Sequence, residues 1–257
     1  MCLLIAAPCI NFFFAACCTT NCGVPDPYIV AESRQKENFY YVPSSHHAPL
    51  LKNKNDLSVA LQHSASNKHS GGELQAAYVA SKHLGILSNL SWGGNKRYED
   101  MNYWKWEMGA GYILPVTKYW HFESYGGVGT GKIDNHHHTG KSIIKNNYLF
   151  LQPAIAVSNL QGSVQFGFVS KFIGNRFSIG EASLNKDREP FTSSQLQLIE
   201  DNPFQLFWEP GFIFRFGWKN FLFHTGYSIS ADLTKSDLHR AKDNFSIGMY
   251  LKFNTGK

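Results

Sequence analysis

The chain has 257 residues, of which 15% are aromatic and 17% are charged, and its formal net charge is +5. After position 18 it has no apolar run of the roughly 20 residues that a transmembrane helix needs, which excludes a polytopic helical membrane protein. The basic residues are scattered, which argues against nucleic-acid binding. A chain rich in aromatic residues and glycine, with many short alternating runs, is typical of β architecture.

The first 17 residues are predicted to be a signal peptide, because an apolar run ends there in small residues. All five cysteines lie within the first 22 positions, so the pattern indicates neither a disulfide framework nor a zinc site. The stretch Phe14-Ala15-Ala16-Cys17 resembles a bacterial lipobox, and this resemblance implies a lipid on Cys17, with Cys18 as second choice. No Lys or Arg precedes Cys17, and a plain secretory signal is the competing interpretation.

Residues 18–55 follow as a polar, proline-containing stretch without clear periodicity, and they are predicted to be a periplasmic tether. From residue 56 to residue 254, apolar and polar residues alternate with the period of two that β-strands show. The ten predicted strands are 56–64, 73–81, 83–92, 103–114, 119–131, 147–158, 162–173, 204–216, 219–229 and 244–253.

Short and long connections alternate strictly between these strands. The tight turns lie near 81–82, 115–118, 159–161 and 217–219, and the longer connections are 65–72, 93–102, 132–146, 174–203 and 230–243. This pattern predicts an all-β fold, an antiparallel up-and-down transmembrane barrel with short periplasmic turns and long outer loops. Both termini would then lie on the periplasmic side, with a lipid on Cys17 in the inner leaflet of the outer membrane.

The two faces of the strands differ sharply in chemistry. Trp104 and Trp106 share one face of their strand, and Lys105 and Glu107 share the other. An outer-membrane barrel turns its apolar face to lipid and its polar face to the lumen, whereas a soluble carrier barrel does the reverse. The pattern favours the membrane barrel. Aromatic residues expected near strand ends suit interfacial girdles: Trp92, Tyr103, Trp104, Tyr119, Trp120 and Tyr148.

The polar faces together carry enough charge to form a network inside the barrel. Buried charges need partners, so ion pairs and hydrogen bonds are expected among them. The predicted members are Lys105, Glu107, Glu123, Lys171, Glu209 and Arg215, with Glu73 and Lys252 on the same faces. A narrow barrel usually has a filled lumen, and a polar conduit or small-ligand site is the alternative.

Three short stretches carry a resemblance to known proteins: Tyr40-Tyr41-Val42-Pro43, Ala48-Pro49-Leu50-Leu51 and Lys54-Asn55-Asp56-Leu57. They resemble the lead-in to the first strand in a lipoprotein-type group of small outer-membrane β-barrel proteins of gram-negative bacteria. The resemblance covers nearly all of residues 40–254, mainly as pattern. It implies insertion by the barrel-assembly machinery, which reads a terminal aromatic residue; Phe253 would match, although four residues follow it.

Two groups of loop residues are candidates for chemistry. Asp237 and His239, with Glu99 and Asp100 in another loop, resemble in residue type the Asp–His pair and facing acidic pair of ten-stranded outer-membrane aspartyl-type proteases. An acid beside a histidine could activate water, although such a pair also arises easily by chance. The metal candidates are Asp134, His136 and His138, for which a solvated loop is the alternative.

No cofactor is predicted. The glycine-rich stretch 126–132 lacks the Ser or Thr that follows the lysine of a phosphate loop. The predicted function is therefore a structural or binding role through the outer loops, especially 174–203, with outer-membrane lipid and an unknown extracellular ligand as partners. The alternatives are a barrel enzyme, either a protease or lipid-modifying, with a site at the outer rim, and a soluble periplasmic carrier.

Overall fold

The computed structural model describes residues 38–254 apart from 67–68, 96–100, 186 and 219. Its elements are β1 (Asp56–Ala65), β2 (His69–Val79), β3 (Leu84–Asn95), β4 (Met101–Pro115), β5 (Trp120–His137), β6 (Gly140–Ser158), β7 (Val164–Ser183), α2 (Pro190–Asp201), β8 (Phe204–Gly217), β9 (Phe221–Ile229), β10 (Ala231–Asp232) and β11 (Asp243–Asn254). Among the described residues, no helix is long and apolar enough to cross a membrane.

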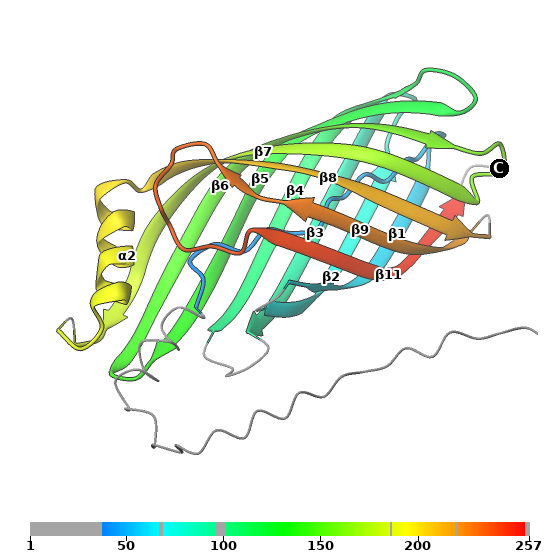
Figure 1. The fold of residues 1–257 in the computed structure, drawn as a ribbon. Coiled ribbons are helices and arrows are strands. Elements are labelled where there is room, and N and C mark those ends of the chain that lie inside the picture. The colour runs from blue at the N-terminus through cyan, green and yellow to red at the C-terminus, as the bar shows by residue number, and fades with distance from the viewer. Residues whose placement is uncertain (1–37, 67–68, 96–100, 186, 219, 255–257) are drawn as a thin grey trace, which may run out of the picture.

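Ten strands form a closed antiparallel barrel (Figure 1). Each strand from β1 to β9 pairs with the next, β9 pairs with β11, and β11 closes the ring against β1. The short strand β10 adds one further pairing beside β8. The predicted ten-stranded up-and-down barrel is therefore confirmed.

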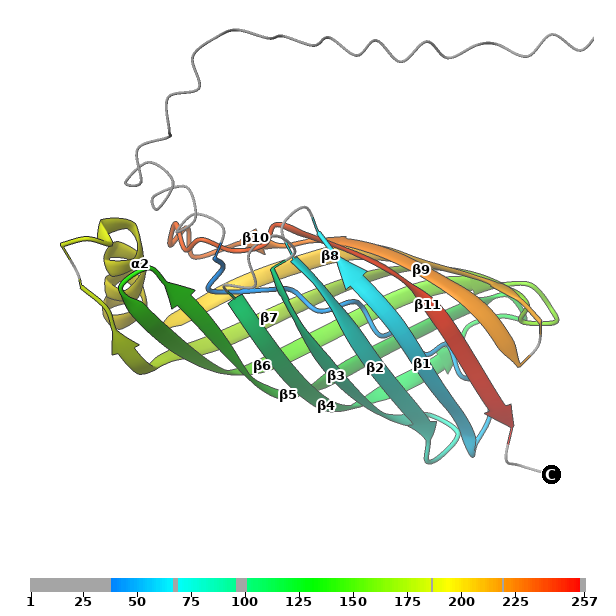
Figure 2. The same ribbon diagram turned by 90° about the horizontal axis from the view of Figure 1, so that it is seen from below.

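The barrel has two different ends. One end, here the short-turn end, holds the connections 80–83, 116–119, 159–163 and 218–220, and there Asp56 pairs with Asn254. The other, here the loop end, holds α2 and the segment 230–242. Figure 2 shows α2 and the last residues of β11 at opposite ends.

One predicted long loop, 132–146, is mostly strand. β5 and β6 continue to His137 and Gly140, so that only a two-residue turn joins them. Beyond the membrane the faces exchange their chemistry: Lys132 and Lys145 point outward, while Ile133 and Ile144 are buried inside. A pattern that expects apolar residues only on the outer face does not detect this extension.

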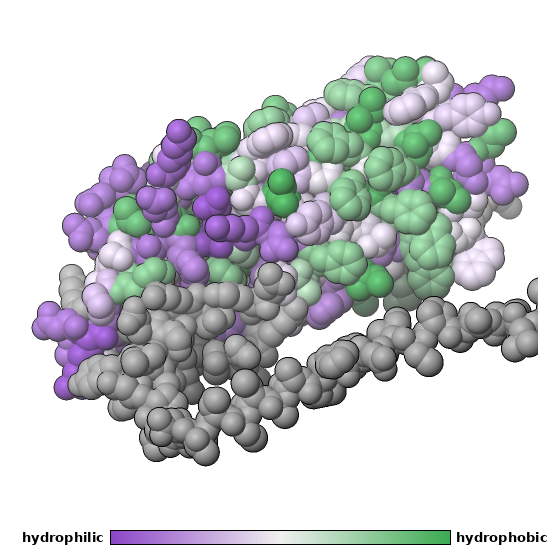
Figure 3. All heavy atoms as spheres, viewed as in Figure 1, coloured by the Kyte–Doolittle hydropathy of each residue, from purple (hydrophilic) through white to green (hydrophobic). Residues whose placement is uncertain are grey.

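The outward side chains of the barrel wall are large, apolar and exposed. Trp104 is 43% exposed and Trp120 48%. Outward apolar residues run along β4 from Trp104 and continue to Val116, directly after the strand. At about 3.3 Å per residue and about 40° of tilt, these roughly 12 steps cover about 30 Å, the thickness of a bilayer core. Figure 3 shows hydrophobic residues over this wall and hydrophilic residues gathered around the loop end. The barrel therefore spans a membrane.

Two expectations fail against this arrangement. A soluble carrier would need its large apolar side chains inside, so that alternative is wrong. Tyr103 and Tyr148, which were expected in the interfacial girdles, face the lumen and are only 5% and 4% exposed. Trp92, Trp104, Tyr119 and Trp120 do point outward. The two tyrosines belong to the inward row of their strands, one residue out of phase with the tryptophans.

Residues 38–55 pass through the barrel, and we call them the luminal segment (Figures 1 and 2). All residues from 38 to 51 are buried. The sequence placed these residues in a tether outside the barrel, and the structure places them inside it. The reason is that a single extended chain surrounded by the wall on all sides has no exposed face, so it shows no periodicity.

Candidate functional site

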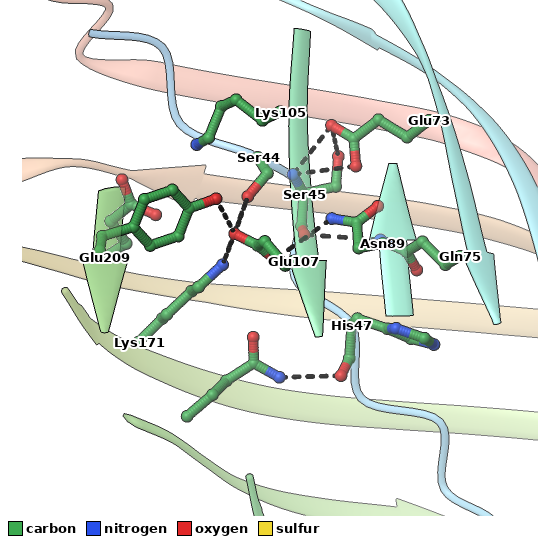
Figure 4. Close-up of polar contacts among 12 residues, drawn as sticks. Ser44, Ser45, His47, Glu73, Gln75, Asn89, Lys105, Glu107, Lys171 and Glu209 are labelled. Atoms are coloured by element: carbon green, nitrogen blue, oxygen red, sulfur yellow. Dashed lines mark hydrogen bonds and ion pairs between the residues drawn. The ribbon is translucent and has the colours of Figure 1, made fainter. Parts of the chain in front are cut away.

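The centre of the lumen holds a buried ion pair between Glu107 of β4 and Lys171 of β7 (Figure 4). Ser44 of the luminal segment joins this pair: its hydroxyl lies 3.0 Å from Glu107 Oε1 and 3.3 Å from Lys171 Nζ. The Tyr148 hydroxyl donates a further hydrogen bond of 3.0 Å to the same Glu107 oxygen. The pair has the additional hydrogen bonds that a buried salt bridge needs.

Lys105 and Glu209 face the luminal segment nearer the loop end. The Lys105 ammonium donates to the backbone oxygen of Val42 at 2.9 Å and lies 5.0 Å from the ring centre of Tyr41. The Tyr41 hydroxyl donates to Glu209 Oε1 at 2.7 Å. The ring of Tyr41 also stacks on Phe207 at 4.2 Å between centroids. These contacts fix the entry of the segment into the lumen.

A second carboxylate, Glu73 of β2, accepts hydrogen bonds from Ser45. The Ser45 amide lies 2.9 and 3.1 Å from the two oxygens, and its hydroxyl lies 3.0 Å from Oε1. Asn244 of β11 donates to the same hydroxyl at 3.1 Å. Figure 4 shows Ser44 and Ser45 directed at carboxylates of two different strands.

Arg215 and Glu123 lie toward the short-turn end. In the described chain, no direct hydrogen bond or salt bridge joins these two side chains. Arg215 Nε donates to His224 Nδ1 at 3.0 Å, and its guanidinium lies 4.0 Å from the ring centre of Tyr250. Glu123 accepts a 3.3 Å bond from the Leu50 amide. The Tyr250 hydroxyl donates to the Pro49 carbonyl.

The structure thus places all six predicted network charges in the lumen, each no more than 3% exposed. Only Glu107 and Lys171 form a salt bridge with one another. Five of the six form a hydrogen bond directly with the luminal segment: Lys105, Glu107, Glu123, Lys171 and Glu209. Sequence reasoning missed this partner. The signal was available, because residues 38–51 contain no Asp, Glu, Lys or Arg.

An apolar core closes the lumen at the loop end. Phe39, Tyr40 and Tyr41 from the luminal segment belong to one buried cluster with Leu196 and Ile199 of α2. Other members come from the extended strands and from the segment 230–242: Ile133, Ile144, Phe177, Leu238 and Ala241. This end of the barrel therefore resembles the interior of a soluble protein, covered by a helix.

Glu189, directly before α2, ties the helix to the β5–β6 turn. Its Oε1 accepts bonds from the amide and hydroxyl of Thr139 at 2.7 and 2.8 Å. Its Oε2 lies 3.4 Å from His137 Nδ1. The first turn of α2 carries no acidic residue and Glu189 makes no side-chain cap bond to the helix, so these contacts to the turn hold the helix in place.

Of the four catalytic candidates, the structure describes Asp237 and His239. The ring of His239 stacks on Phe39 at 5.2 Å and meets Phe191 edge-on at 5.4 Å, while Asp237 is exposed with φ at +54°. Glu99 and Asp100 lie outside the described residues. The geometry of His239 is that of a packing residue in the core of the loop end.

The metal candidates have different surroundings: one is in an ion pair, and the other two are exposed. Asp134 pairs with Lys132 at 2.8 Å, and His136 and His138 are exposed at the end of β5 and in the following turn. Within the described part of the chain, no group of three or more His, Cys, Asp or Glu could hold a metal ion. Cys17, the predicted lipidation site, lies outside the described residues.

Several solved structures resemble this fold at low identity. The KdgM porin is 8% identical, with a TM-score of 0.34, over 77% of this chain and 99% of that chain. The translocator domain of autotransporter NalP from Neisseria meningitidis is 8% identical, with a TM-score of 0.45, over 80% and 90%. Ail of Yersinia pestis is 11% identical, with a TM-score of 0.32, over 79% and 100%.

These likenesses concern the fold alone. No protein-family model matches the sequence, and the comparison with curated proteins gave no match. The assignment as a membrane-spanning barrel therefore depends on the closed sheet and on its outward apolar wall.

Proposed function

We propose that the chain is an outer-membrane β-barrel that conducts no solute and acts by binding at the cell surface through its loop end. The short-turn end would face the periplasm, as in other outer-membrane barrels. Lipid of the outer membrane would surround the wall, and the barrel-assembly machinery would recognise the last strand, where Phe253 points outward.

The observation that carries the proposal is the occupation of the lumen. Ser44 contacts β4 and β7, and its neighbour Ser45 contacts β2 and β11, so the segment touches opposite walls at one level. A conduit would need water across this level. Here protein atoms bridge it, and Glu73, Glu107 and Lys171 at this level form hydrogen bonds with the segment.

The shape of the loop end supports a binding role. β5, β6 and β7 extend beyond the apolar band, and Leu196 and Ile199 of α2 pack into the apolar core at this end. Charged side chains are exposed on this extension, among them the ion pair of Lys141 and Glu181, 46% and 44% exposed. This is the part of the barrel that would project from the membrane toward a partner.

The test combines localisation with conductance. Cells that express the full chain are fractionated, and each fraction is run on a gel heated and unheated. The purified barrel is then reconstituted in a planar bilayer. We expect recovery in the outer membrane, a heat-dependent mobility shift and no stepwise current. Stable single-channel steps from the folded full chain would overturn the closed lumen.

The binding role needs a separate measurement. The purified barrel in nanodiscs is applied to immobilised glycans and to immobilised lipopolysaccharide, beside a variant that carries Lys141→Ala and Glu181→Ala. We expect binding that the loop-end variant weakens. Binding that is unchanged by this variant, and by removal of other exposed loop-end charges, would overturn the loop end as the binding face.

A further inference from the structure

The luminal segment runs through the barrel in one direction. At the loop end, the Asn38 side chain donates to the backbone oxygen of His136 at 3.0 Å. At the short-turn end, the Asn55 amide donates to the Val79 oxygen at 2.8 Å, directly before β1 begins. The chain therefore enters at the loop end and leaves at the short-turn end.

The two limits of the described chain lie at opposite ends of the barrel. Asn254 pairs with Asp56 at the short-turn end. Asn38 lies beside the last residues of β5, and the Tyr40 amide donates to the His239 oxygen in the segment 230–242. The expectation that both termini meet the barrel from the same side does not hold for these residues.

The segment is held at every level of its passage. The Ala241 amide donates to the Tyr41 oxygen at 3.0 Å near the loop end. In the middle, Ser45 bonds Glu73, and further on Gln152 donates to the His47 oxygen at 2.8 Å. Backbone groups of the segment thus find partners on the wall, as buried backbone groups require. The segment is part of the folded barrel.

From this path we infer that the barrel carries its own chain across the membrane, so that the part before Asn38 is displayed on the same side as the loop end. With the proposed orientation, on which this inference rests, that side is the cell surface. The end of the chain at Asn254 stays on the periplasmic side. The barrel then presents two surfaces to the outside: its loop end and its own N-terminal part.

This path changes where a lipid on Cys17 would lie. Between Cys17 and Asn38 there are 21 peptide links, which reach at most about 75 Å when fully extended. Residues 32–37 include Glu32, Arg34, Lys36 and Glu37, which could not cross the apolar band outside the barrel without great cost. A lipid attached to Cys17 would therefore enter the outer leaflet, beside the loop end.

The test uses two epitope tags in the full chain, one inserted after Ala31 and the other added after Lys257. Intact cells and permeabilised cells are labelled with antibody. A heat-dependent mobility shift shows that each tagged barrel is folded. We expect the tag at position 31 to be labelled on intact cells, and the tag after Lys257 to be labelled only after permeabilisation.

Three results would overturn the inference: labelling of the first tag only after permeabilisation, labelling of both tags on intact cells, or labelling of the second tag alone on intact cells. Each would come from a folded barrel and so would concern the path of the chain. Failure of the proposed function is distinguishable, because it appears as current across a bilayer whatever the tags show.

Discussion

The hydroxyl of Ser44 lies 3.0 Å from Oε1 of Glu107, a residue 63 positions further along the chain. The bond joins the luminal segment to the charge pair of the wall at the centre of the membrane-spanning barrel. Ser44 also contacts Lys171, the partner of Glu107. The lumen charges and the luminal segment therefore form one hydrogen-bonded unit. A substitution in either part should change the stability of the other.

Removing one member of the buried ion pair should destabilise the barrel strongly. Lys171→Met leaves the Glu107 carboxylate buried without its counterion, which costs about 3–5 kcal/mol. The double variant Lys171→Met with Glu107→Gln should lose less than the single one. Urea unfolding in micelles, followed by tryptophan fluorescence, measures the free energy of unfolding.

The control is an exposed ion pair, that of Lys141 and Glu181. Lys141→Met breaks the pair with Glu181 at the loop end and should change the stability by about 1 kcal/mol or less, since water screens both charges. Equal losses for Lys171→Met and Lys141→Met would contradict the role of the lumen pair.

The inward and outward rows of the wall were predictable because lipid and lumen impose opposite chemistry on alternate residues. Phe212 and Arg215 illustrate this: one faces lipid at 44% exposure and the other faces the lumen, fully buried. The luminal segment, which is the partner of the lumen charges, was not predictable from this rule, because apolar and polar residues do not alternate regularly in residues 38–51. Their place follows only from the absence of charged residues and from tertiary contacts.

A charge introduced on the outward wall should lower the free energy of unfolding more when it lies deeper in the membrane. Leu151→Arg, near the middle of the apolar band on β6, should cost about 2–4 kcal/mol, whereas Asn147→Arg on the same strand and face should cost about 1 kcal/mol or less. Both variants can be compared by unfolding from lipid vesicles. Similar losses at the two positions would mean that the band does not end between them.

Gly129 should tolerate no side chain, because it lies under the ring of Tyr148. A Cβ there would be 2.3 Å from Cζ of that ring, so the tyrosine would have to leave its hydrogen bond with Glu107. Gly129→Ala should cost about 1–3 kcal/mol. Gly126→Ala on the same strand meets no atom closer than 3.7 Å and is the matched control. A tolerated alanine at position 129 would show that Tyr148 does not hold this place.

Loss of the hydrogen bonds between Glu189 and the β5–β6 turn should make α2 detach from the barrel more often. Glu189→Ala removes the acceptor of both Thr139 bonds, which leaves a buried donor unpaired at about 1–3 kcal/mol. We expect faster cleavage of residues 184–203 by protease added to folded barrels. Ser194→Ala, which removes only a bond to the Phe191 oxygen on an exposed side, should not change the rate. Unchanged cleavage of both variants would assign the anchoring of α2 to its apolar contacts alone.

The luminal segment should be capable of cross-linking to the wall in the assembled barrel. The Ser45 hydroxyl lies 3.1 Å from Asn244 Nδ2, although 199 residues separate them. A variant with Ser45→Cys and Asn244→Cys, treated with a short bifunctional thiol reagent, should close a large loop and migrate faster on a denaturing gel. Each single variant controls for reaction with the native cysteines, all of which precede position 23. A folded double variant that fails to cross-link would place the segment outside the lumen, and the display of the N-terminal part would lose its basis.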